Sequence, residues 1–161
     1  MKRILAVFLV LVVGLPLCAC GAQASEETTI APEAEVTSST APLTEKEQIE
    51  AILTDRIEAE YDATEIDRIT INDDLGTEED GDYIALVYLI WNRKNSGKMS
   101  KEMLRMYSDD LAATLAEKND TVKEMAIFWT VPYLNDRAKC SYERVTNGFA
   151  VMDLIWGKAF S

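Results

Sequence analysis

A run of nine mostly apolar residues, Tyr83–Trp91 (YIALVYLIW), is the feature that most constrains the fold. Its β-branched and aromatic residues, bounded by Gly81 and by polar residues from Asn92 onward, are typical of a β-strand. Because such a strand has little polar surface on either side, it needs cover on much of both faces. We therefore expect a central strand around which the other elements pack.

Two amphipathic helices are predicted from apolar residues at helical spacing. Thr44 and Glu47 form a capping-box pattern that starts the first helix, which ends near Tyr61 or Asp62 and carries an apolar stripe of Ile49, Ile52, Leu53 and Ile57. The second helix begins at about Ser100, ends around residues 118–119, and carries a stripe of Leu104, Tyr107, Leu111 and Leu115. Each helix is expected to pack by one face.

Four more strands are expected. Ile66, Ile69 and Ile71 mark a short one, and the others span about residues 122–134, 137–146 and 149–158, the first of these bulged or partly at an edge because of Pro132. Asn147-Gly148 predicts a type I′ hairpin turn, which would set Tyr142 opposite Asp153, as a structural or solvent-facing pair or as a buried proton-handling site. Asn135-Asp136 predicts a second hairpin turn.

The order α-β-β-α-β-β-β predicts an α+β domain, with a curved antiparallel sheet and two helices packed on one face. This order resembles the nuclear-transport-factor-like cone, and that resemblance implies a sheet wrapped around a helix and an apolar pocket. The same order also divides into α-β-β twice, which resembles the tandem small inhibitory modules of bacterial envelope proteins. No sequence repeat links the two halves.

The N-terminus carries the features of an export signal. Lys2 and Arg3 precede an apolar run that ends at Leu17, too short to span a bilayer. Leu17-Cys18-Ala19-Cys20 resembles the lipobox of bacterial lipoproteins, which implies cleavage before Cys20 and lipidation of its thiol. We expect a signal peptide at 1–19, a lipidated disordered linker at 20–42, and one extracytoplasmic domain at 43–161, anchored to the cell membrane by lipid. An uncleaved helix is the alternative.

The net charge and the cysteine count limit the kinds of partner and of covalent link that the protein can have. Loss of Lys2 and Arg3 with the signal leaves 14 basic against 28 acidic residues, a formal net charge of −14, so nucleic acid is an unsuitable partner. Cys140 is then the last free thiol, which excludes an intrachain disulfide. Its apolar context favours burial over pairing with another chain or reactivity.

Histidine is absent, which excludes the usual triads, histidine bases and most transition-metal sites. The acidic loop Asp73–Asp82 lacks the spacing of an EF-hand, so a solvated loop is preferred to a loose calcium site. Lys98 and Lys101, with amides near Ser100, either hold an anion or lie on a plain exposed loop. Neither a cofactor nor a metal is expected.

Aromatic strand residues suggest a binding role. A sheet curling away from the small residues Ala112, Ala113 and Ala116 would leave an apolar cavity, with ligand-binding residues Trp91, Trp129, Trp156 and Tyr142. We expect a non-enzymatic, membrane-tethered domain that binds an apolar small ligand or an envelope protein partner. The alternatives are a carboxylate-dependent hydrolase of the cell envelope and a purely structural surface accessory protein.

Overall fold

The computed structural model describes residues 42–73, 76 and 81–161. The chain divides into two units, residues 1–39 and 40–161, and every described residue lies in the second. The predicted signal segment and residues 20–41 lie outside the described residues. The predictions made for them, including lipidation of Cys20, therefore stay predictions.

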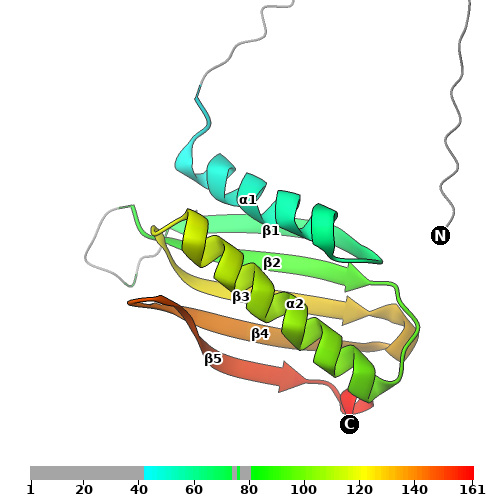
Figure 1. Ribbon diagram of the computed structural model, residues 1–161. Helices are drawn as coiled ribbons and strands as arrows, with labels where there is room; N and C mark the ends of the chain where they lie inside the picture. Colours follow the sequence, from blue (N-terminus) through cyan, green and yellow to red (C-terminus); the bar gives the residue numbers. More distant parts are fainter. Residues whose placement is uncertain (1–41, 74–75, 77–80) are drawn as a thin grey trace, which may run out of the picture. The chain divides into compact units, whose positions relative to one another are not determined.

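The predicted α+β class and element order are confirmed. The described residues form two helices and five strands, which can be followed in Figure 1, and a short 3₁₀ helix follows each of β3 and β5. The elements are α1 (Glu45–Glu60), β1 (Thr64–Asp73), β2 (Tyr83–Trp91), α2 (Gly97–Lys118), β3 (Val122–Val131), η1 (Pro132–Leu134), β4 (Asp136–Val145), β5 (Gly148–Trp156) and η2 (Lys158–Phe160).

The five strands form one open sheet in the order β1-β2-β3-β4-β5, so both halves of the chain share a single sheet. The prediction of a fully antiparallel sheet is wrong at one place, because β2 and β3 pair in parallel. The reason is α2, whose 22 residues span roughly 33 Å at 1.5 Å per residue and return the chain to the end of the sheet from which β2 started. All other neighbouring strands are antiparallel.

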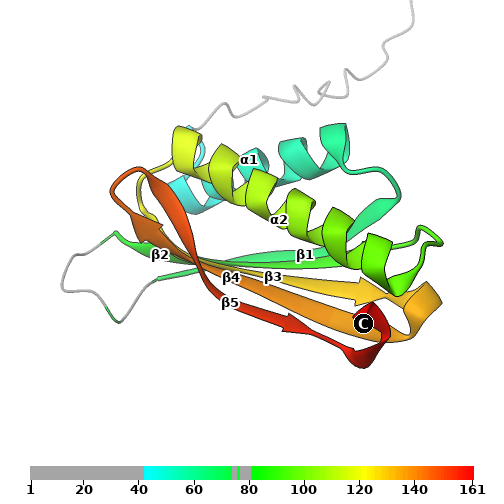
Figure 2. The ribbon, with the colours of Figure 1, turned by 60° about the horizontal axis from the view of Figure 1, so that its bottom comes forward.

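Both helices lie on the same face of the curved sheet, as Figure 2 shows. The capping box of α1 is confirmed, since the Thr44 hydroxyl accepts from the Glu47 amide and the Glu47 carboxylate accepts from the Thr44 amide. Residues of every element contribute fully buried side chains or partly buried ones packed against them. The largest of those fully buried are Trp91, Trp129, Tyr142, Phe160, Ile49, Leu53, Ile57, Leu89, Leu104, Leu111, Leu115 and Met125.

The central strand is covered less evenly than predicted. Its helix-facing residues Ala85, Val87, Leu89 and Trp91 are buried, whereas the alternate residues are half-buried on the open face. There the Tyr88 and Phe128 rings stack with centroids 4.6 Å apart, and the Arg68 guanidinium lies 3.6 Å above Tyr88. Stacked side chains of neighbouring strands thus supply part of the cover on that face.

The β4–β5 hairpin exists, but its predicted register is wrong. Val145 pairs with Gly148, so the two-residue loop is Thr146-Asn147, and Tyr142 lies opposite Val151 instead of Asp153. Of the two predicted turn residues only Gly148 has positive φ, at 142°. In this register Arg144 lies opposite Phe149, and its guanidinium sits 4.3 Å above the Phe149 ring, a cross-strand contact that favours the observed pairing.

Pro132 does not disturb a strand, contrary to the prediction. It opens η1 immediately after β3 ends, where its missing N–H costs no ladder hydrogen bond. Asn135 ends η1 in the left-handed region at φ 49° and leads into β4, as expected for a turn residue. β3 is an inner strand between β2 and β4, and its register shift against β2 lies at its start, next to Val122, far from Pro132.

Candidate functional site

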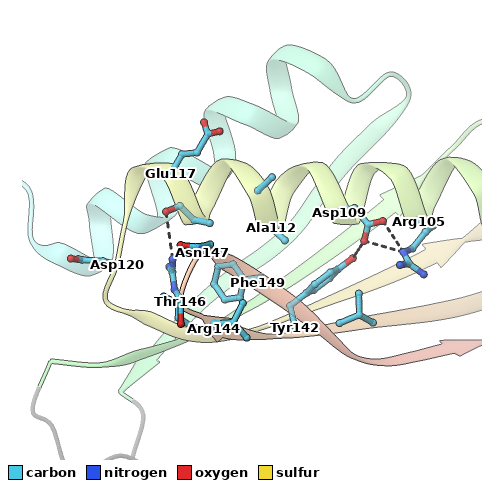
Figure 3. Close-up of a pocket in the computed structure, with 15 residues that line it drawn as sticks. Arg105, Asp109, Ala112, Glu117, Asp120, Tyr142, Arg144, Thr146, Asn147 and Phe149 are labelled. Atoms are coloured by element: carbon cyan, nitrogen blue, oxygen red, sulfur yellow. Dashed lines mark hydrogen bonds and ion pairs between the residues drawn. The ribbon is translucent and has the colours of Figure 1, made fainter.

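A hollow of about 1110 Å³ lies between α2 and the β4–β5 hairpin. On the helix side it is lined by Arg105, Asp109, Ala112 and Ala116, whose spacing of three or four residues sets them on one face of α2. Figure 3 shows Tyr142 and Phe149 beneath this face, between Asp109 at one end and Arg144 at the other. The predicted alanine gap is therefore the place where a hollow forms.

Two local features keep this space open. The residues of α2 that line it include Ala112, Ala113 and Ala116, whose short side chains leave room beside the helix. The β4–β5 ladder also shifts register between Ser141 and Tyr142, which marks a β-bulge. A bulge bends its strand and increases the local twist. Val151 beside it stays 42% exposed although it faces the helix side.

Tyr142, Asp109 and Arg105 form a connected group at one end of the hollow. The Tyr142 hydroxyl donates to Asp109 Oδ1 at 2.8 Å, and Arg105 Nε donates to both carboxylate oxygens at 2.9 and 2.8 Å. Burial and the hydrogen bond to Asp109 raise the pKa of Tyr142, so the phenol stays protonated. The hydrogen bond to Asp109 also raises the pKa of Arg105. The group thus fixes a phenol ring and a guanidinium in place.

Arg144 closes the other end. It donates through Nε to the Val122 carbonyl at 2.9 Å and through its terminal nitrogens to Asn119 at 2.6 Å and Ala116 at 3.4 Å. Burial lowers the pKa of Arg144, but an arginine remains a cation in proteins. Its donors are used on the end of α2 and on β3, so Arg144 shapes the hollow and leaves little capacity for a ligand.

A second, smaller groove of about 620 Å³ begins at Arg105 and runs beside the first turns of α2. Its lining combines basic and apolar side chains: Lys98, Lys101, Glu102, Arg105, Leu154, Trp156, Phe160 and Ser161. Two further hollows, of about 390 and 410 Å³, lie between the two helices and on the open face of the sheet.

The structure separates the four predicted ligand-binding residues. Trp91 and Trp129 are buried in the core, where their indole nitrogens donate to the Asp62 carbonyl and the Ser108 hydroxyl, and neither lines one of these four hollows. Of the four predicted residues, Trp156 lines the smaller groove and only Tyr142 lines the larger hollow. The predicted Tyr142–Asp153 pair is wrong, since Tyr142 bonds to Asp109.

Sequence reasoning missed Arg105, Asp109 and Arg144. The spacing of Arg105 and Asp109, four residues apart on a helix, was a usable signal for their ion pair, although not for its position beside Tyr142. Nothing local to Arg144 indicated that it would reach the end of α2. Cys140 is fully buried, as predicted, and burial raises the pKa of its thiol.

The predicted acidic loop lies mostly outside the described residues. Of its described acids, Asp73 pairs with Lys46 and Asp82 with Lys123. Across residues 42–73, 76 and 81–161, no group of three or more acidic or cysteine side chains is arranged to hold a metal ion. In the same residues, neither helix combines the length and the apolar character that crossing a membrane requires.

Comparison with known proteins leaves the site to be judged on its geometry. No family model matches the chain, and no similar curated protein or solved structure was found.

Proposed function

We propose that residues 43–161 form a binding domain, tethered outside the cytoplasmic membrane through Cys20, that holds a small and partly apolar ligand. The observation that carries this proposal is the hollow of about 1110 Å³ between α2 and the β4–β5 hairpin. Small-molecule sites are concave and mostly apolar, with a few fixed polar groups. The alanines, Phe149 and Val151 supply the apolar lining, and Tyr142 with Arg105 supplies the fixed polar groups.

The arrangement favours binding over hydrolysis. A carboxylate-dependent hydrolase needs one carboxyl group free to donate a proton and a second placed across the scissile bond. Asp109, whose side chain is 45% exposed, is occupied by both Tyr142 and Arg105. Glu117 and Asp120 also line the hollow, but both are exposed to solvent. The hollow thus offers a shaped surface with no reactive pair at its centre.

Filling the hollow tests the proposal. We expect the neutral dye N-phenyl-1-naphthylamine to bind with increased fluorescence, and Ala116→Leu to weaken that binding by about tenfold, because the added carbons occupy ligand space. The matched control is Ala59→Leu, an exposed alanine on α1 that does not line this hollow. Equal dye affinity in the Ala116→Leu and unchanged proteins, or no binding to either, would contradict the proposal.

A further inference from the structure

Three cationic side chains gather at the N-terminal end of α2 in an otherwise acidic chain. Lys98, Lys101 and Arg105 line the smaller groove, where Glu102 is the only acidic side chain. Neither lysine forms an ion pair with any described residue, and both are exposed. On a chain with a net charge of −12, such a local cluster of basic side chains suggests a site for an anion.

Arg105 contributes to the groove although it is bound to Asp109. It uses only Nε on the carboxylate, and its two terminal nitrogens have no hydrogen-bond partner among the described residues. A guanidinium held through one nitrogen keeps its planar edge available for a second acceptor. Arg105 therefore lies at the junction of the hollow and the groove with donors to spare.

The opposite wall of the groove is aromatic and apolar. Trp156 and Phe160 meet edge to face, with ring centroids 5.4 Å apart and an interplanar angle of 63°, and Leu154 lies beside them. Lys101 Nζ lies 5.5 Å from the centre of the Trp156 ring. Trp156 is half-buried, so part of its surface faces the groove. An apolar wall next to unpaired cations matches a ligand with both characters.

The end of α2 itself contributes little. The Ser96 side chain caps the helix by accepting from the Met99 amide, and the Ser100 amide bonds to the Ser96 carbonyl. The amides near Ser100 considered from the sequence are thus partly occupied. The charge is supplied by the side chains of Lys98, Lys101 and Arg105, with the helix dipole adding to it.

We propose that this groove binds an apolar or aromatic anion, with its charged group at Lys98, Lys101 and Arg105 and its apolar body against Trp156, Phe160 and Leu154. The proposal concerns a second site and does not depend on occupancy of the hollow beneath the α2 alanines. The volume of about 620 Å³ is within the usual range for small ligands. A free amphiphilic anion and an anionic lipid share this chemistry.

A matched pair of dyes tests the role of charge. 1-Anilinonaphthalene-8-sulfonate carries the same ring system as N-phenyl-1-naphthylamine plus one sulfonate. With the full chain carrying Cys20→Ala, so that no attached lipid competes, we expect the double variant Lys98→Gln, Lys101→Gln to bind the sulfonate about five- to tenfold more weakly. Affinity for the neutral dye should not change, and added salt should weaken only the sulfonate.

The control removes the same charge elsewhere, through Lys94→Gln with Lys118→Gln, two exposed lysines outside the groove. It should retain the affinity for the sulfonate, as should Ala116→Leu, whereas Trp156→Leu should lose it. Sulfonate affinity that survives the double variant at Lys98 and Lys101 but is lost in Ala116→Leu would overturn the proposal. That result would still allow the hollow beneath the α2 alanines to be a binding site. Loss of neutral-dye binding alone would count against the hollow and not against the groove.

Two further measurements identify the source of the anion. Displacement of the sulfonate by laurate, without sedimentation on phosphatidylglycerol vesicles, would support a free amphiphile. Sedimentation that requires Lys98 and Lys101 would support a lipid. If neither laurate nor the vesicles compete with the sulfonate, an apolar anion is not the ligand and the proposal is wrong.

Discussion

Arg144 shows how one side chain can connect its own strand to a helix across a site that both of them line. Its three donors reach carbonyls of α2, of the residue that ends it, and of β3. The last carbonyls of a helix have no partner within it and need donors from outside. Arg144 supplies them while its guanidinium covers the Phe149 ring. The end of α2 and the tip of the β4–β5 hairpin are thereby held together.

Removing this side chain should therefore destabilise the domain. We expect Arg144→Ala to lower the free energy of unfolding by about 2 kcal/mol, because it leaves carbonyls unpaired and exposes Phe149. Urea denaturation followed by circular dichroism measures the change. The control, Arg137→Ala, removes an exposed arginine from the same strand whose side chain forms no described hydrogen bond. Equal losses in the two variants would contradict this role for Arg144.

At the scale of elements, the two helices are joined by one polar contact set. Arg56 on α1 donates to both oxygens of Asp110 on α2 at 2.8 and 2.6 Å. The Tyr61 hydroxyl lies 2.8 Å from both Asp110 Oδ2 and the Tyr107 carbonyl, and the rings of the two tyrosines stack at 4.4 Å. The hydrogen bonds from Arg56 hold the pKa of Asp110 below its usual range.

This contact predicts a pH dependence. Because the folded-state pKa of Asp110 is lowered, its contribution to stability is present above the unfolded value of about 4 and is lost as pH falls through the folded value. Asp110→Asn should therefore lower stability at neutral pH and flatten its decline below about pH 4. Urea midpoints measured between neutral pH and about pH 2.5 test this. Asp55→Asn, at an exposed aspartate on α1 with no described hydrogen bond or ion pair, should leave the slope unchanged.

The elements themselves were largely predictable, whereas their pairing was not. The capping box at Thr44 and the apolar run of β2 are local patterns, so the bounds of α1 and β2 follow from nearby residues. The parallel β2–β3 pair depends on α2 returning the chain to the end of the sheet where β2 starts. The hairpin register depends on the contact of Arg144 with Phe149. The parallel pair is set by residues distant in sequence and the register by a contact across the hairpin, and hydrophobic periodicity reports neither.

The candidate site was likewise predictable from the sequence only in part. Its small residues and Tyr142 could be read from α2 and β4. Trp91 and Trp129 were predicted to bind a ligand because aromatic residues on strands were expected to be partly exposed. These strand positions instead face the two helices and are buried. Arg105 and Asp109 were visible as a helical ion pair, but only the fold places them beside Tyr142.

For the whole molecule, the decisive expectation is that membrane attachment and folding reside in different parts of the chain. The core described above lies within residues 42–161, and among the described residues of this range no helix is long and apolar enough to cross a membrane. We propose that attachment occurs through the Cys20 thiol, because Leu17-Cys18-Ala19-Cys20 resembles a lipobox. Two acyl chains on that thiol would anchor the protein stably, since each buried methylene contributes about 0.8 kcal/mol.

Cys20→Ala should therefore move the protein from the membrane fraction to the soluble fraction and abolish labelling by a radioactive fatty acid. The free energy of unfolding of the released protein should equal that of a chain truncated to begin at Leu43, because we expect the segment before Leu43 to act only as a linker. Cys140→Ala is the matched control, which removes the other remaining thiol and should leave labelling intact. A Cys20→Ala protein that stays with the membrane would instead indicate an uncleaved N-terminal helix, and unfolding energies that differ would place part of the fold before Leu43.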